Sequence, residues 1–256
     1  MKDIVNGFDS FIATFKNYSD NYIIVGGTAT NILLRKAYLT ARSTKDIDMI
    51  LIAENLTPDF GKVFWNFIKS GEYVPYFSKD NIPHYYRFIN NSNLNYPKMI
   101  ELFSRKQGLE MPVDLTFTHL FIDNEVSSLS AIILDDEYYS FMLSGKINLD
   151  GVSLLSPFHL IAFKARAHVD LCNKKSQGLL VCEKDLKKHK NDIFRLLQLL
   201  DVNEKYPVPD IVKKDIKDFL SIVNCENVSV EKLTNGALSY DLAVNIIMKV
   251  FNIHQS

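Results

Sequence analysis

Cysteines, metal-binding motifs and long apolar runs are all scarce in this chain of 256 residues. Its three cysteines, Cys172, Cys182 and Cys225, are widely spaced and form no CxxC pair, which argues against a disulfide framework or a zinc site. No apolar stretch approaches the roughly 18 residues that a membrane-spanning helix requires, and the N-terminus has no apolar signal segment. We therefore expect a cytoplasmic protein with no membrane partner.

An excess of charge of one sign is also missing. The chain has 29 basic and 30 acidic residues, which gives a formal net charge of −1, so no global field attracts a nucleic acid. Ten glycines and eight prolines leave little room for low-complexity linkers. Apolar residues make up 47% of the chain, which is enough for one large core or two smaller ones.

The apolar pattern changes character along the chain. Short β-rich runs predict strands at residues 22–25, 46–52, 85–89, 99–103, 113–117 and 152–155, and helical periodicity covers 3–16, 29–34 and 57–68. From Pro157 onward only helical patterns follow, at 157–172, 185–200, about 209–223 and about 238–252. We predict an α+β fold, with a mixed sheet and flanking helices in a domain over residues 1–155 and a helical C-terminal domain over 156–256.

Two acidic residues begin the predicted strand at residues 46–52. Because residues two apart in a strand point to the same face, the carboxylates of Asp46 and Asp48 are expected side by side. Like charges are costly there unless a cation neutralises them, and carboxylate oxygens are preferred ligands of Mg²⁺. The alternative is an exposed strand end with two solvated acids, and the short Asp-x-Asp pattern does not decide between the two.

A glycine turn is predicted between the strand at 22–25 and the following helix. Gly26 and Gly27 have no side chains, which lets a phosphate approach the backbone N–H groups at the helix N-terminus. Thr28 is predicted either to cap the helix or to donate its hydroxyl to the phosphate. Tight turns also use glycine for backbone reasons alone. The occurrence of this turn and the Asp-x-Asp strand in this order is therefore more informative than either motif alone.

A third carboxylate on an adjacent strand would complete a two-metal site. Glu101 and Asp114 both lie among apolar residues of predicted strands. We favour Glu101 because two apolar residues flank it on each side, as is typical of a central strand. Asp114 is the alternative third ligand.

These motifs together resemble a known family. Gly26-Gly27-Thr28-Ala29, followed after a helix by Arg42-Ser43-Thr44-Lys45-Asp46-Ile47-Asp48, is similar to the glycine turn and Asp-x-Asp strand of the DNA polymerase β-like nucleotidyltransferase superfamily. Within that superfamily the chain resembles the abortive-infection toxins of the AbiEii type, which also carry a helical lysine and a Lys-rich Asp motif. The matching residues here are Lys164 and Asp192, so the resemblance spans about residues 22–200. The spacing from Gly27 to Asp46 is somewhat longer than the family pattern.

Lys164 and Asp192 also stand out by their positions in helical patterns. Lys164 falls on an apolar stripe, and lysine is rarely buried without a partner, so it either snorkels to the surface or points inward at a phosphate. Asp192 borders the stripe of the next predicted helix, either as a solvated acid or as a functional one. Residue pattern alone leaves both alternatives open.

Basic residues gather between Lys174 and Arg195. Seven of them stand against three acidic residues in this stretch. Such a run is either a solvated helix face or a surface for the phosphates of a nucleotide or an RNA. Lys188 and Lys190 are the members of this run that we predict to bind nucleotide.

The resemblance implies metal-dependent transfer of an NMP from an NTP to an acceptor hydroxyl. Two Mg²⁺ ions, or Mn²⁺ in their place, would be held by Asp46, Asp48 and Glu101. The glycine turn would hold the triphosphate. Lys164 would add positive charge near the transferred group, and Asp192 would position Lys164 or the acceptor.

The resemblance also implies a setting and a partner. The acceptor would be RNA, at the 3′ end of a tRNA, and the protein would be a toxin restrained by a cognate antitoxin. One alternative is transfer to the hydroxyl of a small molecule or a protein, as in other members of the superfamily. Another is a non-catalytic nucleotide-binding module, against which the intact glycine and Asp-x-Asp motifs argue.

Overall fold

The computed structural model describes residues 5–77, 83–90, 92–105, 133, 135–226 and 228–254. Its contacts divide the chain into two compact units. A sheet unit comprises residues 1–32, 42–133 and 146–155, and a helical unit comprises 33–41, 134–145 and 156–256. The segments 33–41 and 134–145, which we expected in the N-terminal domain, group with the helical unit, and the border between two domains at residue 155 stays a prediction.

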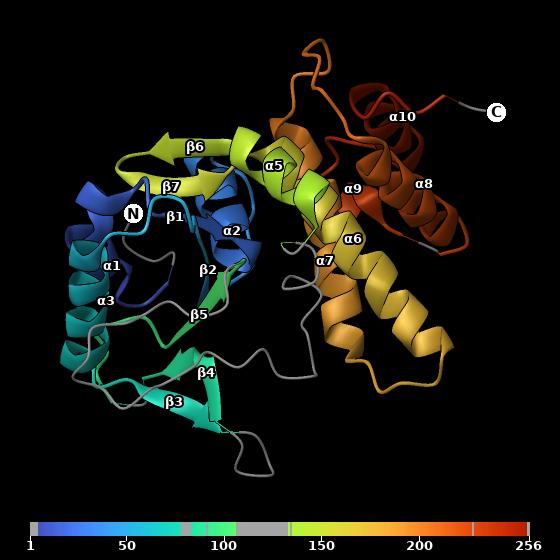
Figure 1. Cartoon of the computed structure of the whole chain (residues 1–256). Coiled ribbons are helices and arrows are strands. Elements are labelled where there is room, and N and C mark those ends of the chain that lie inside the picture. Colours follow the sequence, from blue (N-terminus) through green and yellow to red (C-terminus); the bar gives the residue numbers. More distant parts are fainter. Residues whose placement is uncertain are drawn as a thin grey trace. The chain divides into compact units, whose positions relative to one another are not determined.

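A seven-stranded mixed sheet forms the centre of the sheet unit (Figure 1). Its strands are β1 (Tyr22–Val25), β2 (Asp46–Leu51), β3 (Val74–Phe77), β4 (Pro83–Ile89), β5 (Met99–Ser104), β6 (Lys146–Leu149) and β7 (Val152–Leu155). The order across the sheet is β3-β4-β5-β2-β1-β7-β6. Strand β2 runs parallel to β5 and β1 runs parallel to β7, while the other neighbouring pairs are antiparallel.

Most predicted strands are confirmed. The five at 22–25, 46–52, 85–89, 99–103 and 152–155 correspond to β1, β2, β4, β5 and β7, and the predicted strand at 113–117 lies outside the described residues. All four residues of β1 and of β7 are buried, which matches their apolar sequences and their places inside the sheet. Strands β3 and β6 are edge strands of four residues that we did not predict.

Aromatic side chains pack one face of the sheet against two helices, α1 (Phe8–Phe15) and α3 (Pro58–Ser70), which lie next to each other in Figure 1. Helix α3 begins as predicted, with Pro58 in its first turn and the Thr57 hydroxyl accepting a hydrogen bond from Phe60 N. The Phe11 ring lies 5.7 Å from that of Tyr22 on β1, and the Phe64 ring lies 5.9 Å from that of Phe88 on β4. Because this face is filled by rings, the alternate residues of the strands are left for the opposite face.

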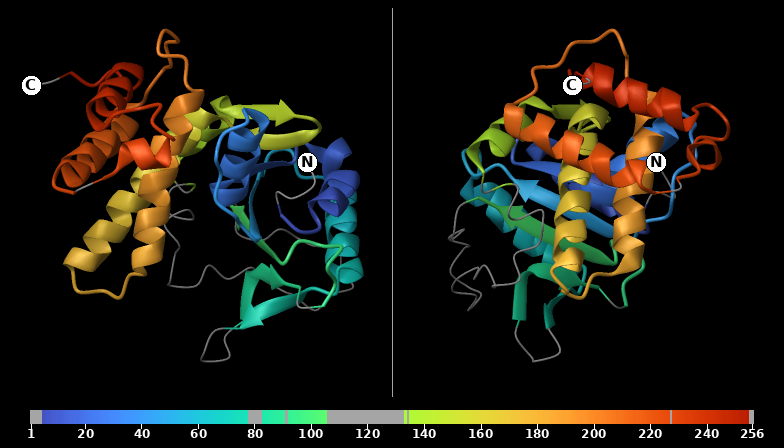
Figure 2. Two further views of the ribbon diagram at one scale, coloured as in Figure 1. Left: turned by 180° about the vertical axis from the view of Figure 1, so that it is seen from behind. Right: turned by 90° about the vertical axis from the view of Figure 1, so that its right-hand side faces the viewer.

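In the described part of the helical unit, all the regular secondary structure is helical. They are α5 (Asp136–Ser144), α6 (Pro157–Ser176), α7 (Glu183–Leu196), α8 (Asp210–Asn224), α9 (Val230–Leu233) and α10 (Tyr240–Val250), with the end of α2 (Gly26–Lys36) and the 3₁₀ turn η2 (Leu197–Leu199). The 3₁₀ turn η1 (Lys16–Tyr18) belongs to the sheet unit. Helices α6 and α7 run side by side (Figure 2). The four helical patterns predicted after Pro157 are confirmed as α6, α7, α8 and α10, and the predicted α+β fold is confirmed with them.

A buried carboxylate ties three of these helices together. Asp215 on α8 accepts a hydrogen bond from the Tyr138 hydroxyl on α5 and a second, of 2.8 Å, from Arg166 Nη1 on α6. Both bonds compensate the carboxylate for the water lost on burial. Among the helices that the structure describes, none combines the length and apolar character needed to cross a membrane.

Candidate active site

The two acids of β2 lie on the face of the sheet that the aromatic helices leave uncovered. Ile47 and Met49 are fully buried, whereas Asp46 and Asp48, which alternate with them, are partly exposed. Met49 pairs with Ile24 on β1, so its side chain points to the same face of the sheet as that of Tyr22. This is the face on which Phe11 of α1 packs. The strand therefore presents both carboxylates on one face, away from the aromatic core.

The strand register adds Glu101 to these two acids. Asp48 is the partner of Glu101 in the parallel pairing of β2 with β5, and of Val25 in the antiparallel pairing with β1. Parallel partners on neighbouring strands point to the same face. We call Asp46, Asp48 and Glu101 the carboxylate face. Asp114, the alternative third acid, lies outside the described residues.

An arginine on the next strand already contacts this face. Arg87 on β4 is the register partner of Glu101, and its Nε forms an ion pair with Glu101 Oε1. The pKa of Glu101 is nevertheless raised from 4.5 to about 7, because burial disfavours its charged form and because Asp48, and less strongly Asp46, repel a further negative charge. Arg87 opposes this shift without cancelling it. The carboxylates of this face therefore repel one another in spite of the ion pair with Arg87.

Such neighbouring carboxylates suit a divalent cation, but a complete ligand set is not assembled. Within the described residues, no group of three or more His, Cys, Asp and Glu side chains is gathered closely enough to hold a metal ion. The predicted three-carboxylate set is therefore incomplete in this arrangement, since Glu101 is bonded to Arg87. Asp46 and Asp48 remain as a pair, and Mg²⁺ is commonly bound by one or two carboxylates with substrate phosphates completing its shell.

The glycines lie directly beside the carboxylate face, although not in the turn that we predicted. Helix α2 begins at Gly26 itself, immediately after β1, so both glycines belong to its first turn. Gly26 has φ +65°, and a Cβ placed on it would lie only 1.9 Å from Asp48 Oδ2. A Cβ on Gly27 would lie 2.6 Å from Arg42 Nη2 and 2.9 Å from Thr44 Oγ1. The left-handed backbone and the approach of Asp48 require glycine at position 26, whereas the nearest atom at position 27 is the far end of the Arg42 side chain.

Thr28 has a different position from the predicted one. Its side chain is fully buried, and its hydroxyl donates a hydrogen bond to the backbone carbonyl of Asp46. This bond ties the first turn of α2 to the start of β2. The hydroxyl is therefore neither a helix cap nor available to a phosphate, which leaves only the backbone N–H of Thr28 for the predicted contact.

In the helical unit, Lys164 and Asp192 form a buried ion pair. Lys164 Nζ lies 2.9 Å from Asp192 Oδ2, and the two side chains are 3% and 0% exposed. Arg195 Nη1 lies 3.4 Å from the other oxygen, Asp192 Oδ1. The two surface alternatives are therefore wrong, because Lys164 does not snorkel and Asp192 is not solvated. Their catalytic roles stay predictions.

A histidine next to this ion pair is a feature that the sequence pattern did not single out. Nδ1 of His189 is buried and has no hydrogen-bond partner among the described residues. The pKa of His189 lies well below its ordinary value because of burial and of the nearby positive charge of Lys164 and Lys188. His189 is therefore neutral at physiological pH and leaves the charge of Asp192 to Lys164.

Several basic residues of the stretch from Lys174 to Arg195 form ion pairs within the protein. Lys174 pairs with Asp170 at 3.1 Å, Lys175 with Glu183 at 2.5 Å, and Lys190 with Glu226. Two of these acids, Asp170 and Glu226, lie outside the stretch, so its local sequence overstated the positive charge. Lys190, predicted to bind nucleotide, has its ammonium group bonded to a carboxylate, whereas Lys188 is partly exposed.

The structure also shows two arginines that the sequence interpretation did not assign to the site. Arg87 interrupts an apolar strand, as Glu101 does, and this shared pattern was a usable signal. Arg42 stands in a loop without periodicity, and its position over Gly27 depends on the fold. Both bring positive charge to the carboxylate face or to the start of α2.

Comparisons with known proteins return one similar structure. No family model matches the chain, and no curated protein matches it. A crystal structure of an antigenic nucleotidyltransferase-like protein from Paracoccidioides brasiliensis is similar at a TM-score of 0.44 and 15% identity. The similarity covers 86% of this chain and 88% of that one. The functional argument below therefore rests on the residues and their geometry.

Proposed function

We propose that the chain is a metal-dependent nucleotidyltransferase that moves an NMP from an NTP to an acceptor hydroxyl. The observation that carries this proposal is the register of Asp48 with Glu101, with Asp46 on the same face and the first turn of α2 against Asp48. Neighbouring carboxylates beside a helix N-terminus suit a metal-bound triphosphate, because the metal would neutralise the acids and the backbone N–H groups would donate hydrogen bonds to the phosphates.

Each group on this side of the sheet has a part in the proposed reaction. Asp46 and Asp48 would hold Mg²⁺, which would supply positive charge to the α-phosphate during attack by the acceptor hydroxyl and to the departing pyrophosphate. The N–H groups of Gly26 and Gly27 bind phosphate oxygens. Arg42, positioned over Gly27, adds positive charge there.

Glu101 and Lys164 have less direct support. Glu101 serves as third metal ligand only if it exchanges its bond with Arg87 for one to the metal. Lys164 supplies positive charge to the transferred group in the family that the sequence resembles, and here Asp192 holds it in one position. Lys188, which is partly exposed, is the lysine of the basic stretch that would contact phosphates.

RNA is the proposed acceptor, with the 3′ end of a tRNA as its specific site in a toxin–antitoxin or phage-defence setting. The resemblance of the glycine and Asp-x-Asp motifs to the AbiEii-type toxins supports this acceptor. A cognate antitoxin is the proposed protein partner on the same ground.

The test is incubation of the purified chain with each α-labelled NTP, Mg²⁺ and total RNA. The Asp46→Asn/Asp48→Asn variant serves as the inactive enzyme, and Asp9→Asn/Asp59→Asn, in the first turns of α1 and α3, serves as a charge-matched control. We expect label in RNA with the wild type and the control only. Label in a small molecule or in protein would replace the RNA acceptor by that class. Metal-independent nucleotide binding without transfer in any fraction would contradict the enzymatic proposal.

A further inference from the structure

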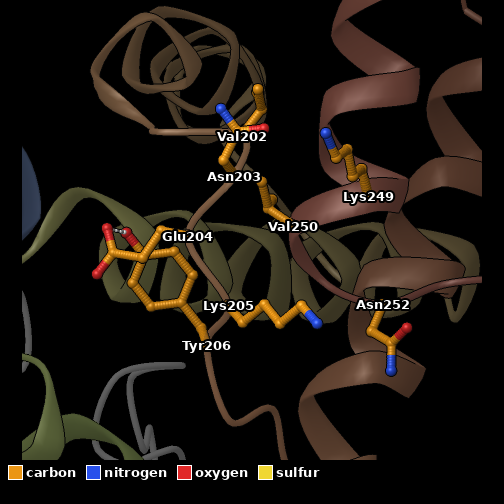
Figure 3. A pocket seen from close by; sticks show the side chains of 8 residues that line it. All are labelled: Val202, Asn203, Glu204, Lys205, Tyr206, Lys249, Val250 and Asn252. Carbon is orange, nitrogen blue, oxygen red and sulfur yellow. Dashed lines mark hydrogen bonds between the residues drawn. The ribbon is translucent and has the colours of Figure 1, made fainter.

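A pocket of about 470 Å³ lies in the helical unit, between the segment 202–206 and the end of α10 (Figure 3). Its polar lining residues are Asn203, Glu204, Lys205 and Tyr206 from the first segment and Lys249 and Asn252 from the second. Sites for small molecules typically have volumes of about 300–1,000 Å³. The pocket is therefore large enough for a compact metabolite.

Stacked rings and a tight turn hold the first wall in place. The Tyr206 ring stacks on that of Phe158 at 3.9 Å, and Phe158 stacks on Phe251 at 4.4 Å. Asn203 N donates a 2.9 Å hydrogen bond to the side chain of Asp201, which closes the turn before the pocket. Because both ends of the segment are anchored, the lining is built before any ligand arrives.

The second wall is the C-terminal cap of α10. Asn252 has φ +53°, a left-handed conformation in which asparagine often ends a helix. Its N–H bonds to Lys249 O at 3.3 Å, and Ile253 N bonds to Met248 O at 2.8 Å. These bonds satisfy two of the last helix carbonyls and so reduce the negative potential that would repel an anion at this end.

Three charged side chains line the pocket: the cations Lys205 and Lys249 and the acid Glu204. Lys205 and Lys249 form no ion pair with any described residue, in contrast to Lys213 and Lys214 on the neighbouring helix α8, which bond to aspartates at 2.9 and 2.7 Å. Glu204 Oε2 accepts a 2.5 Å hydrogen bond from the Tyr206 hydroxyl, drawn as a dashed line in Figure 3. Glu204 is thereby held by the tyrosine and keeps lone pairs for a further donor.

We propose that this pocket binds a phosphate monoester that carries hydroxyl groups. The ammonium groups of Lys205 and Lys249 lie apart in Figure 3, but both side chains are exposed and flexible, so they can turn toward one phosphate. The exposed side-chain amides of Asn203 and Asn252 are further donors. A hydroxyl of the same molecule donates to Glu204. All these residues belong to the helical unit, and none is part of the carboxylate face, so this inference does not rest on the proposed function.

The test is NMR titration of the full-length chain with AMP, ribose 5-phosphate and inorganic phosphate, in EDTA to prevent metal-dependent binding elsewhere. We expect AMP or ribose 5-phosphate to shift the amide signals of Asn203, Lys205 and Asn252. The Lys205→Ala/Lys249→Ala variant should bind each compound about tenfold or more weakly, because two charge-assisted contacts are lost. The Lys217→Ala/Lys232→Ala variant, which removes two exposed lysines elsewhere in the unit, should bind as the wild type does.

The Glu204→Gln variant tests the hydroxyl contact separately. Removal of its charge should strengthen the binding of inorganic phosphate, while the ratio of ribose 5-phosphate affinity to phosphate affinity should fall. AMP binding without ribose 5-phosphate binding would identify a nucleotide as the ligand, and comparable binding of both would identify a sugar phosphate moiety. The proposal is overturned if these amide signals do not move, or if both lysine double variants lose affinity equally.

Discussion

The carboxylate face of the sheet unit and the Lys164–Asp192 pair of the helical unit differ in how their charges are balanced. Like charges are neighbours on the face, whereas opposite charges are neighbours in the pair. On the face, Glu101 forms an ion pair with Arg87, yet burial and the nearby carboxylates of Asp48 and Asp46 raise its pKa to about 7. In the pair, one acid receives two cations, at 2.9 and 3.4 Å. A buried ion pair is complete without any ligand. Repulsion between neighbouring carboxylates destabilises the folded state, and packing does not explain why it is kept. The face is therefore the stronger indication of function.

The largest expected effect is that of Asp48→Asn. If the face holds a metal, nucleotidyl transfer falls about a thousandfold or more, while the melting temperature in EDTA stays equal or rises because repulsion of Glu101 is relieved. Single-turnover assays and scanning calorimetry measure the two effects. A fall in melting temperature that parallels the loss of activity would show that Asp48 has a structural role, as Asp192 has.

Lys164→Met tests the other half of the comparison. It removes the 2.9 Å ion pair of the buried Asp192 carboxylate, so we expect a loss of about 3–5 kcal/mol in the free energy of unfolding. Urea denaturation followed by fluorescence and circular dichroism measures it. Lys175→Met, which breaks an exposed pair with Glu183, is the matched control and should leave the free energy of unfolding nearly unchanged.

The double variant Lys164→Met/Asp192→Leu separates packing from chemistry. Both charges are removed together, so stability should return to near that of the wild type. If transfer stays absent in this stable protein, Lys164 or Asp192 acts in the reaction. If transfer returns as well, the pair serves the fold alone, and the catalytic roles implied for it are wrong.

Gly26→Ala sharpens the comparison at the edge of the carboxylate face. A Cβ there meets Asp48 Oδ2 at 1.9 Å in a left-handed conformation, so displacement of the acid should lower transfer about a hundredfold. Gly178→Ala is the control, because Gly178 has φ +82° but nothing within 4 Å of the new Cβ, and should cost only about 1–2 kcal/mol of strain. In an Asp48→Ala background the stability cost of Gly26→Ala should fall toward that of the control.

The smallest effect concerns His159, which is buried and satisfied without a charge. Its ring nitrogens bond to Ser144 and Ser156, and burial lowers its pKa from 6.5 to about 4. As pH falls through 6.5, His159 binds a proton in the unfolded chain but stays neutral in the folded chain until the pH reaches about 4. The free energy of unfolding therefore falls over this range. We expect His159 to contribute a loss of about 2 kcal/mol between pH 7.5 and pH 5. The His159→Gln variant should lose less stability by that amount, and it should keep the part that is due to His168 and His189, whose pKa values are also lowered. Urea denaturation at both pH values measures it.

The sequence was sufficient to predict those strands whose apolar pattern coincides with burial in the structure. The apolar runs of β1, β2 and β5 are long enough to identify these strands, and alternation alone placed Asp46 and Asp48 together. Strands β3 and β6 are short edge strands, and helix α5 has a weak apolar stripe, so local pattern did not predict them.

Contacts between distant segments could not be predicted in the same way. The bond of Glu101 to Arg87 follows from the register of β4 with β5, and no residue type fixes a register. The partners of Lys174 and Lys190 include acids from outside the basic stretch, which a local count of charge omits. Thr28 was assigned to a phosphate by its place in a motif, whereas the helix start places its hydroxyl against the Asp46 carbonyl.

The division of the chain between its units has a consequence for how the protein can be dissected. The helical unit draws on three separate stretches, and Tyr138, from the middle one, donates to the buried Asp215 of the last. A fragment beginning at Ser156 would retain Arg166 but lack that tyrosine. It would thus expose the underside of α8 and leave one oxygen of a buried acid without its donor. A fragment that is to keep the Asp215 contacts must therefore include residues 134–145 as well as the helices that follow Ser156.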